Sequence, residues 1–159
     1  MATVSPAKPW AYTLQLPHDP GSARIARAIV RALLDHYNLD ELTATATLLT
    51  SELVTNAYLH SNGPASLRVR GLSPDRLRIS VCDTNPVIPA PFDRPPVDLL
   101  GPCGTSLALD AESGRGLLLV RLCAANWGGY ALGEELFGMA GKLLWFELLP
   151  EREAFGVAA

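Results

Sequence analysis

The run LDELTATATLLTSELVTNAYLH, residues 39–60, constrains the fold more than any other segment of the chain. Plotted as a helix at about 100° per residue, it places four apolar residues within a sector of roughly 60°. These residues are Leu42, Ala46, Leu49 and Leu53. On the same wheel Asn56 and His60 fall in or beside that sector, and Glu52 lies on its flank. The buried face of this predicted helix is therefore apolar in its first half and polar in its second.

Polar groups buried without partners would each cost on the order of 1–3 kcal/mol. The polar half of the helix is therefore predicted to face a cavity, an ion or a ligand. A structural alternative is that Asn56 and His60 only cap and end the helix. His60 is left outside the catalytic set, as a wall residue or a cation at the helix end.

The remaining patterns predict an α+β chain. A strand is expected over residues 10–17, and a helix over 20–39 in which Ile25, Ile29 and Leu33 recur at helical spacing. Asp40 is the expected N-cap of the second helix. Further downstream the patterns predict a hairpin over 65–83, a helix over 114–127 and two strands over 127–132 and 142–149.

One domain is expected over residues 10–150, with a flexible N-terminus (1–9) and a flexible tail (151–159). Between the hairpin and the third helix, residues 84–113 are rich in proline. A stretch of this length without regular structure is often a functional lid.

Composition excludes several classes of function. The net charge of −3 gives no basic footprint for nucleic acid. No apolar run approaches the length of about 18–20 residues that a membrane span needs, and the N-terminus lacks the regions of a signal peptide. Three cysteines without a CxxC spacing fit reduced thiols in a cytoplasmic protein.

Two downstream features are candidates to meet the polar helix. Asp83 ends the apolar strand ISVCD, where a carboxylate often accepts a hydrogen bond from a donor such as an exocyclic amine. The segment ESGRG, residues 112–116, opens a helix, and glycines there let backbone N–H groups approach an anion. Each feature alone is weak, because Asp also begins ordinary turns and glycines begin many helices.

The order of the three features is specific. It resembles the GHKL nucleotide-binding fold of gyrase, histidine kinases and MutL-type proteins, over roughly residues 14–149. ELVTNAYLH is similar to the N box, CDTNP to a diverged first glycine box and ESGRGLLLV to the second. With LLTSELVTNA and the final GKLLWFEL, the chain looks most like anti-sigma-factor serine/threonine kinases of high-GC bacteria.

The resemblance implies a two-layer Bergerat sandwich, in which helices cover one face of a mixed, mostly antiparallel sheet. ATP would lie between the helices under the lid. Glu52 would act as catalytic base or orient the attacking hydroxyl. Asn56 would hold Mg²⁺, and Asp83 would accept from the adenine amine. The residues implied to contact the nucleotide are Asn56, Asp83, Asn85, Gly114, Arg115, Gly116 and Leu117.

The sequence departs from the family pattern at two places. Asp83-Thr84-Asn85-Pro86 replaces the usual Asp-x-Gly-x-Gly, and Asn85 is expected to retain the turn because asparagine tolerates the left-handed conformation. Leu143 stands where relatives often carry a threonine, so that one polar contact near adenine is expected to be missing.

Two functional classes remain after subclasses that need a second domain or a dimerising histidine hairpin are set aside by length. One is a kinase that phosphorylates a small STAS-type antagonist and sequesters a sigma factor. The other is a nucleotide-gated binding module without transfer activity. The resemblance also implies a homodimer, and neither class involves nucleic acid or membrane.

Overall fold

The computed structural model describes residues 8–90, 92, 115–133 and 140–150, with the backbone alone at 115 and 116. Five strands form one sheet in the order β1-β2-β3-β5-β4. Their bounds are β1 Trp10–Leu16, β2 Ala65–Ser73, β3 Arg76–Asp83, β4 Asn126–Leu132 and β5 Gly141–Leu148. The helices are α1 Ser22–His36, a 3₁₀ turn η1 Asp40–Leu42, α2 Thr43–His60 and α3 Arg115–Cys123.

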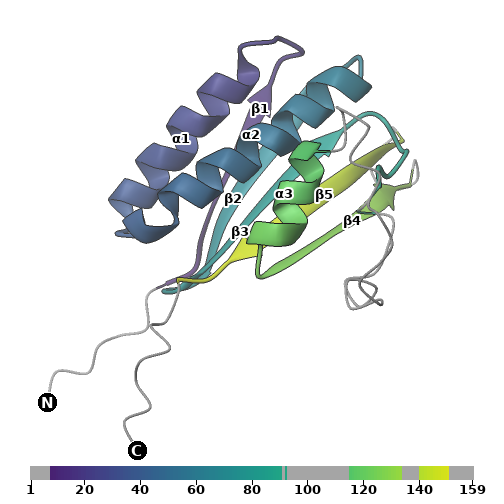
Figure 1. Ribbon diagram of the computed structural model, residues 1–159. Coiled ribbons are helices and arrows are strands. Elements are labelled where there is room, and N and C mark those ends of the chain that lie inside the picture. Colours follow the sequence, from purple (N-terminus) through teal and green to yellow (C-terminus); the bar gives the residue numbers. More distant parts are fainter. Residues whose placement is uncertain (1–7, 91, 93–114, 134–139, 151–159) are drawn as a thin grey trace, which may run out of the picture.

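The molecule has two layers, with all three α-helices on one face of the sheet (Figure 1). Alternate strand residues point toward the helices and build the core, as strand geometry requires. Examples are Leu67 and Val69 of β2 and Ile79 and Val81 of β3, all buried. The predicted α+β sandwich is thereby confirmed. Every strand pair among the described residues is antiparallel, so these residues contain no parallel pair of the kind a mixed sheet would have.

The second helix has the predicted core face. Its four sector residues are buried, and these are Leu42, Ala46, Leu49 and Leu53. Its predicted start is wrong. Asp40 makes no capping hydrogen bond; it begins the 3₁₀ turn, and α2 follows from Thr43. The tight turn replaces a side-chain cap, because the backbone N–H of Leu42 donates to the carbonyl of Leu39 at 2.9 Å.

The helix predicted from the spacing of Ile25, Ile29 and Leu33 is present as α1, but these residues do not form its most buried row. The buried residues are Ser22, Ala26, Val30 and Leu34. Ile25 is 52% exposed, whereas Ile29 and Leu33 are half-buried. Small side chains at 22 and 26 let α1 approach its neighbours closely, and helical spacing alone does not choose between two adjacent rows.

The third helix is shorter than predicted. It ends at Cys123, and Trp127, predicted in that helix and again in the next strand, belongs to β4. The backbone N–H of Ala125 donates to the carbonyl of Glu147 at 2.9 Å, so the chain joins β5 before the expected helix end. Within the described part of the chain, no helix combines the length and the hydropathy needed to cross a bilayer.

Candidate functional site

Three elements converge at one end of the molecule: the C-terminal half of α2, the end of β3 beside the start of β5, and the first turn of α3 (Figure 1). A hydrogen bond joins two of them, since the Asn85 side-chain amide donates to the carbonyl of His60 at 2.6 Å. The polar half of α2 therefore lies beside the strand-end carboxylate, as the sequence predicted.

Asn56 is the most informative residue of this region. It is buried, with 6% of its surface exposed. Its side-chain carbonyl oxygen Oδ1 has no hydrogen-bond partner among the described residues. A buried acceptor without a partner carries a desolvation cost of about 1–3 kcal/mol. An exception of this kind in a folded protein calls for a ligand, an ion or a water.

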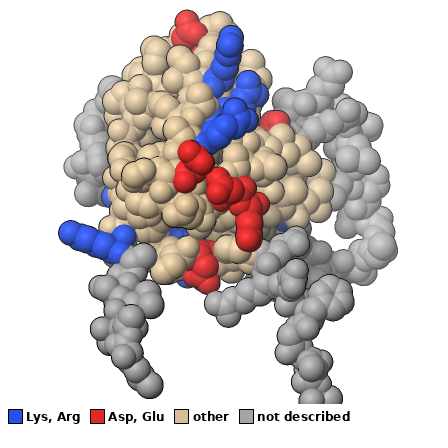
Figure 2. All heavy atoms as spheres, turned by 90° about the vertical axis from the view of Figure 1, so that its left-hand side faces the viewer, with Lys and Arg blue, Asp and Glu red and all other residues tan. Residues whose placement is uncertain are grey.

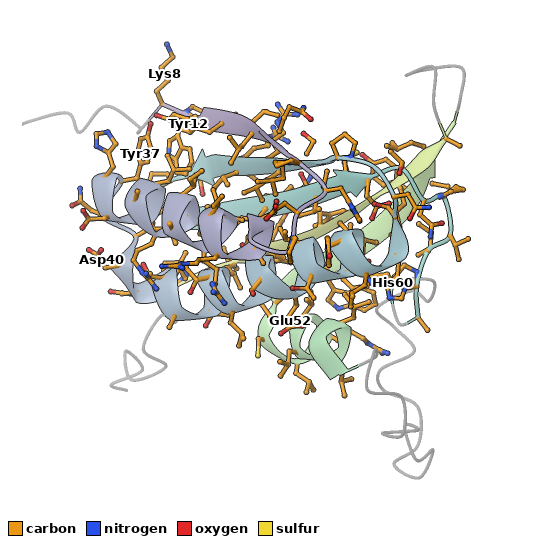
Figure 3. The ribbon with its side chains drawn as sticks, turned by 90° about the horizontal axis from the view of Figure 1, so that it is seen from above. Lys8, Tyr12, Tyr37, Asp40, Glu52 and His60 are labelled. Atoms are coloured by element: carbon orange, nitrogen blue, oxygen red, sulfur yellow. The ribbon has the colours of Figure 1, made fainter. Side chains whose placement is uncertain are left out.

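Glu52 precedes Asn56 by one helical turn. It is half-buried, and Figure 3 shows it on the side of α2 next to α3. Within the described ranges its carboxylate makes no hydrogen bond or ion pair. His60 lies exposed at the end of the same helix, and its backbone carbonyl is already used by Asn85.

Asp83 is paired with a residue that the sequence patterns did not single out. Cross-strand register places Lys142 of β5 directly opposite it. The Lys142 ammonium Nζ lies 2.7 Å from Asp83 Oδ2 and donates to Oδ1 at 2.9 Å. Both residues are buried, at 8% and 1% exposure. The strand-end carboxylate is therefore charge-balanced from within the protein.

Asn85 forms the turn after Asp83, but not through the predicted left-handed backbone conformation. Asn38 is the residue with positive φ among the described non-glycine residues, so Asn85 does not adopt the left-handed conformation. Instead, the Asn85 N–H donates to Asp83 Oδ1 at 2.8 Å, and Asn85 Oδ1 accepts from the Val87 N–H at 3.0 Å. Hydrogen bonds thus retain the turn where the expected glycines are missing.

The second glycine segment is partly described. Gly114 lies outside the described residues, whereas Arg115 and Gly116 form the first turn of α3. Leu117 is buried in the core, so only its backbone N–H can contribute to an anion site. The expected lid lies largely outside the described residues. Its described Phe92 is buried against Trp127, with ring centroids 5.5 Å apart.

Comparison with known protein families shows to which family the chain belongs. A family model described as the histidine kinase-like ATPase domain matches residues 16–125, more than half of the chain. The chain belongs to this family. A search among curated proteins found no match. Membership in the histidine kinase-like ATPase family supports an ATP-binding regulatory role, and the matched range contains Glu52, Asn56 and Asp83.

The residues present fit the nucleotide and Mg²⁺ that a histidine kinase-like ATPase domain implies. The unpaired Oδ1 of Asn56 is a neutral oxygen of the kind that hard cations accept. No cluster of three His, Cys, Asp or Glu side chains suited to a metal occurs among the described residues.

The position of Leu143 in the sheet bears on the polar contact near adenine that is expected to be missing, and that expectation stays a prediction. Leu143 pairs with Cys82, one position before Asp83. Because strand side chains alternate between faces, Leu143 lies on the face of the sheet away from the helices. Lys142 is the residue of this strand that meets Asp83. Sequence reasoning missed it, although a lysine at the start of an otherwise apolar strand was a signal.

Gly141 allows β3 and β5 to come together beside this pair. A Cβ at position 141 would lie 2.2 Å from the backbone carbonyl oxygen of Asp83. We expect Gly141→Ala to lower the free energy of unfolding by about 1–3 kcal/mol, the usual cost of overpacking. Urea denaturation measures it. Gly133→Ala is the matched control, because a Cβ there meets nothing within 4 Å and stability should change little.

Equal destabilisation by the two glycine substitutions would contradict this account of Gly141. Loss of helix content in the Gly141 variant would likewise point to a different cause, since the clash is confined to the two strands.

The cysteines give a test of burial near the site. Cys82 is half-buried, and desolvation, followed by the neighbouring Asp83 charge, raises the pKa of its thiol. A raised thiol pKa leaves less thiolate at a given pH, and the thiolate is the reactive form. In a Cys103→Ser background we expect iodoacetamide at pH 8 to label exposed Cys123 before Cys82. Mass spectrometry measures the order, and faster labelling of Cys82 would contradict it.

Proposed function

We propose that this protein is an ATP- and Mg²⁺-binding anti-sigma factor with serine/threonine kinase activity toward a small antagonist protein. The observation that carries the nucleotide part is the buried, unpaired Oδ1 of Asn56 in a histidine kinase-like ATPase domain. The kinase part is supported by Glu52 one turn away, whose carboxylate makes no hydrogen bond or ion pair within the part of the chain that the structure describes.

Each residue has a defined role in this proposal. Asn56 holds Mg²⁺ through Oδ1, and the ion neutralises charge on the phosphates when it is bound. Asp83 accepts a hydrogen bond from the adenine amine. The first turn of α3, with Arg115, Gly116 and Leu117, offers backbone N–H groups to phosphate, because orphan donors at a helix N-terminus favour anions. Gly114, which is outside the described residues, is proposed to add its own N–H.

Glu52 acts on the hydroxyl of the antagonist. It orients the serine or threonine oxygen and accepts its proton as that oxygen bonds to the γ-phosphorus of ATP. The bond from that phosphorus to the bridging oxygen breaks, and ADP leaves. Phosphoryl transfer depends mainly on positioning and charge neutralisation. The proposed reaction therefore needs one carboxylate to position the hydroxyl and one side chain to hold the metal ion.

The exposed surface of α1 suits a protein partner. Arg24, Arg27 and Arg31 are exposed along the helix, followed by exposed Asp35 near its end and Asp40 after it. Figure 2 shows a band of basic side chains on this side of the molecule above a cluster of acidic ones. Such separated charges orient a protein partner, which here is proposed to be a sigma factor or a STAS-type antagonist. A homodimer and a cytoplasmic location complete the proposal.

A second candidate is a nucleotide-gated binding module without transfer activity. It is favoured by the engagement of Asp83 with Lys142, which leaves the carboxylate fewer free acceptor positions than an unpaired one would have. The module shares the nucleotide site with the kinase, and differs from it only in whether a phosphoryl group moves.

Calorimetric titration with ATP, with and without Mg²⁺, tests the shared part of both candidates. We expect heat of binding that is strengthened by the metal. Incubation with γ-labelled ATP and a candidate antagonist then separates them. Absence of binding at millimolar ATP would overturn both proposals, whereas binding without labelling of a genuine antagonist would leave the module.

A further inference from the structure

We propose that Lys142 is a positioning residue for recognition of the nucleotide base, and that it acts through Asp83 without touching the nucleotide. The inference rests on the proposed ATP site and names a residue that determines its specificity. Three observations carry it: the contacts that Lys142 makes, the pattern of acceptors left on Asp83, and the burial of both residues.

The Lys142 ammonium is turned toward Asp83 and buried away from any ligand. It donates to Asp83 Oδ1 at 2.9 Å and to the backbone carbonyl of Asn85 at 3.4 Å. It is also ion-paired with Asp83 Oδ2, which lies 2.7 Å from Nζ. With 1% of its surface exposed, Lys142 does not have the access to bind a phosphate or a base directly.

The same contacts determine which part of the Asp83 carboxylate remains open. Each oxygen of a carboxylate has about two acceptor positions. Oδ1 accepts from both Lys142 Nζ and the Asn85 N–H, whereas Oδ2 is ion-paired with Lys142 and accepts no hydrogen bond among the described residues. The open acceptor is therefore Oδ2. An acceptor oxygen fixed in this way recognises an amine donor such as that of adenine and rejects the carbonyl that guanine presents there.

Lys142 also makes burial of this acceptor possible. A buried carboxylate without a counter-charge is strongly disfavoured, and Lys142 supplies that charge from the opposite strand. Gly141 supports the arrangement by letting the backbones of the two strands approach at this point. The lysine thus balances the charge, fixes the side-chain geometry and leaves Oδ2 open to a donor.

A double-mutant cycle with two nucleotides tests the proposal. ATP and GTP, each with Mg²⁺, are titrated into wild type, Asp83→Asn, Lys142→Met and the double variant. We expect wild type to prefer ATP by about tenfold or more, and Lys142→Met to reduce the preference to within about threefold, as loss of a fixed buried acceptor should. The preference should be absent from Asp83→Asn and the double variant alike.

Lys8→Met is the matched control, because Lys8 and Lys142 are the only lysines of the chain and Lys8 is exposed. The ratio of ATP to GTP affinity should be unchanged in it. A purely structural role of Lys142 would weaken both nucleotides together and leave the ratio intact, which would overturn the proposal. A direct contact to the nucleotide would make the two effects additive, which would overturn it as well.

Two features keep the test decisive if Lys142→Met does not fold. In the double variant neither buried charge is left unbalanced, so comparing it with Asp83→Asn still shows whether Lys142 acts beyond Asp83. In Lys8→Met protein Lys142 is the single lysine, and acetylation by an N-hydroxysuccinimide ester, located by mass spectrometry of peptides to separate it from the N-terminal amine, reports on it. We expect slow acetylation of Lys142 with or without ATP, whereas exposure to the reagent on ATP binding would overturn the proposal.

Failure of the inference is distinguishable from failure of the proposed function. If wild type binds neither nucleotide, the ATP site itself is wrong and the inference falls with it. If wild type binds ATP and Lys142→Met keeps its full adenine preference, the inference alone is wrong. If wild type binds ATP and GTP equally, Asp83 does not read the base, and the inference is again wrong while the ATP site stands.

Discussion

Replacing Asn56 with alanine is expected to weaken binding of ATP in the presence of Mg²⁺ by about 10- to 150-fold. The estimate is the loss of one contact to a charged group, about 1.5–3 kcal/mol, converted at tenfold for each 1.4 kcal/mol. The physical reason is the buried Oδ1, which has no partner among the described residues and is the oxygen proposed to hold the metal. Calorimetric titration measures the change.

The same substitution should not destabilise the free protein through a lost hydrogen bond at Oδ1. Removing an unsatisfied buried acceptor removes its desolvation cost, and this offsets part of the packing lost on truncation. Thr55→Ala, at the exposed neighbouring position, is the control and should bind ATP as wild type does. Two results would refute the role of Asn56: unchanged ATP affinity, or an equal loss of affinity in the absence of Mg²⁺.

The positions of two candidate residues, Glu52 and Asn56, were predictable because both lie on one helix. Helical spacing alone placed Asn56 on the buried face of α2 and Glu52 on its flank. The hairpin that ends in Asp83 was equally readable from alternation of apolar and polar residues. These features depend on contacts between near neighbours, which a single sequence records.

The pairing of Lys142 with Asp83 and the hydrogen bonds that form the turn at Asn85 were not predictable in this way. The pair of Asp83 with Lys142 depends on β5 lying beside β3, and these residues are 59 positions apart. Register between strands so distant follows from packing of the whole sheet, and a slip of one residue would have placed Leu143 there instead. Asn85 likewise acts through bonds to α2 and β5, which no local propensity encodes.

Two helix boundaries were predicted wrongly, the start of α2 and the end of α3. Both follow from contacts that the local sequence does not encode. Asp40 carries the side chain of a good cap, but the chain tightens into a 3₁₀ turn there. The third helix ends early because a backbone hydrogen bond to Glu147 draws residue 125 onto the sheet. In both places a tertiary or backbone contact overrides a local signal, which is the usual limit of propensity.

The largest expected effect belongs to Glu52 and separates the kinase from the binding module. Glu52→Gln preserves the shape of the side chain but removes its ability to accept a proton. Loss of a general base typically lowers a rate by about 10²- to 10⁴-fold, so phosphorylation of the antagonist should fall by at least about 100-fold. ATP affinity should stay within a few-fold of wild type, because Glu52 is proposed to contact the attacking hydroxyl and not the base or the metal.

Single-turnover transfer from γ-labelled ATP to the antagonist measures the rate, and calorimetry measures the affinity in parallel. Glu41→Gln is the matched control, since Glu41 is exposed on the 3₁₀ turn away from the site and should transfer at the wild-type rate. A Glu52→Gln protein that phosphorylates the antagonist at the wild-type rate would remove Glu52 from catalysis.

If wild type itself binds ATP, releases its sigma factor in response to the nucleotide and transfers no phosphoryl group, the chain is a nucleotide-gated binding module. In that case the Glu52 carboxylate would contact the sigma factor and not a reacting hydroxyl. Glu52→Gln should then change the affinity for the sigma factor.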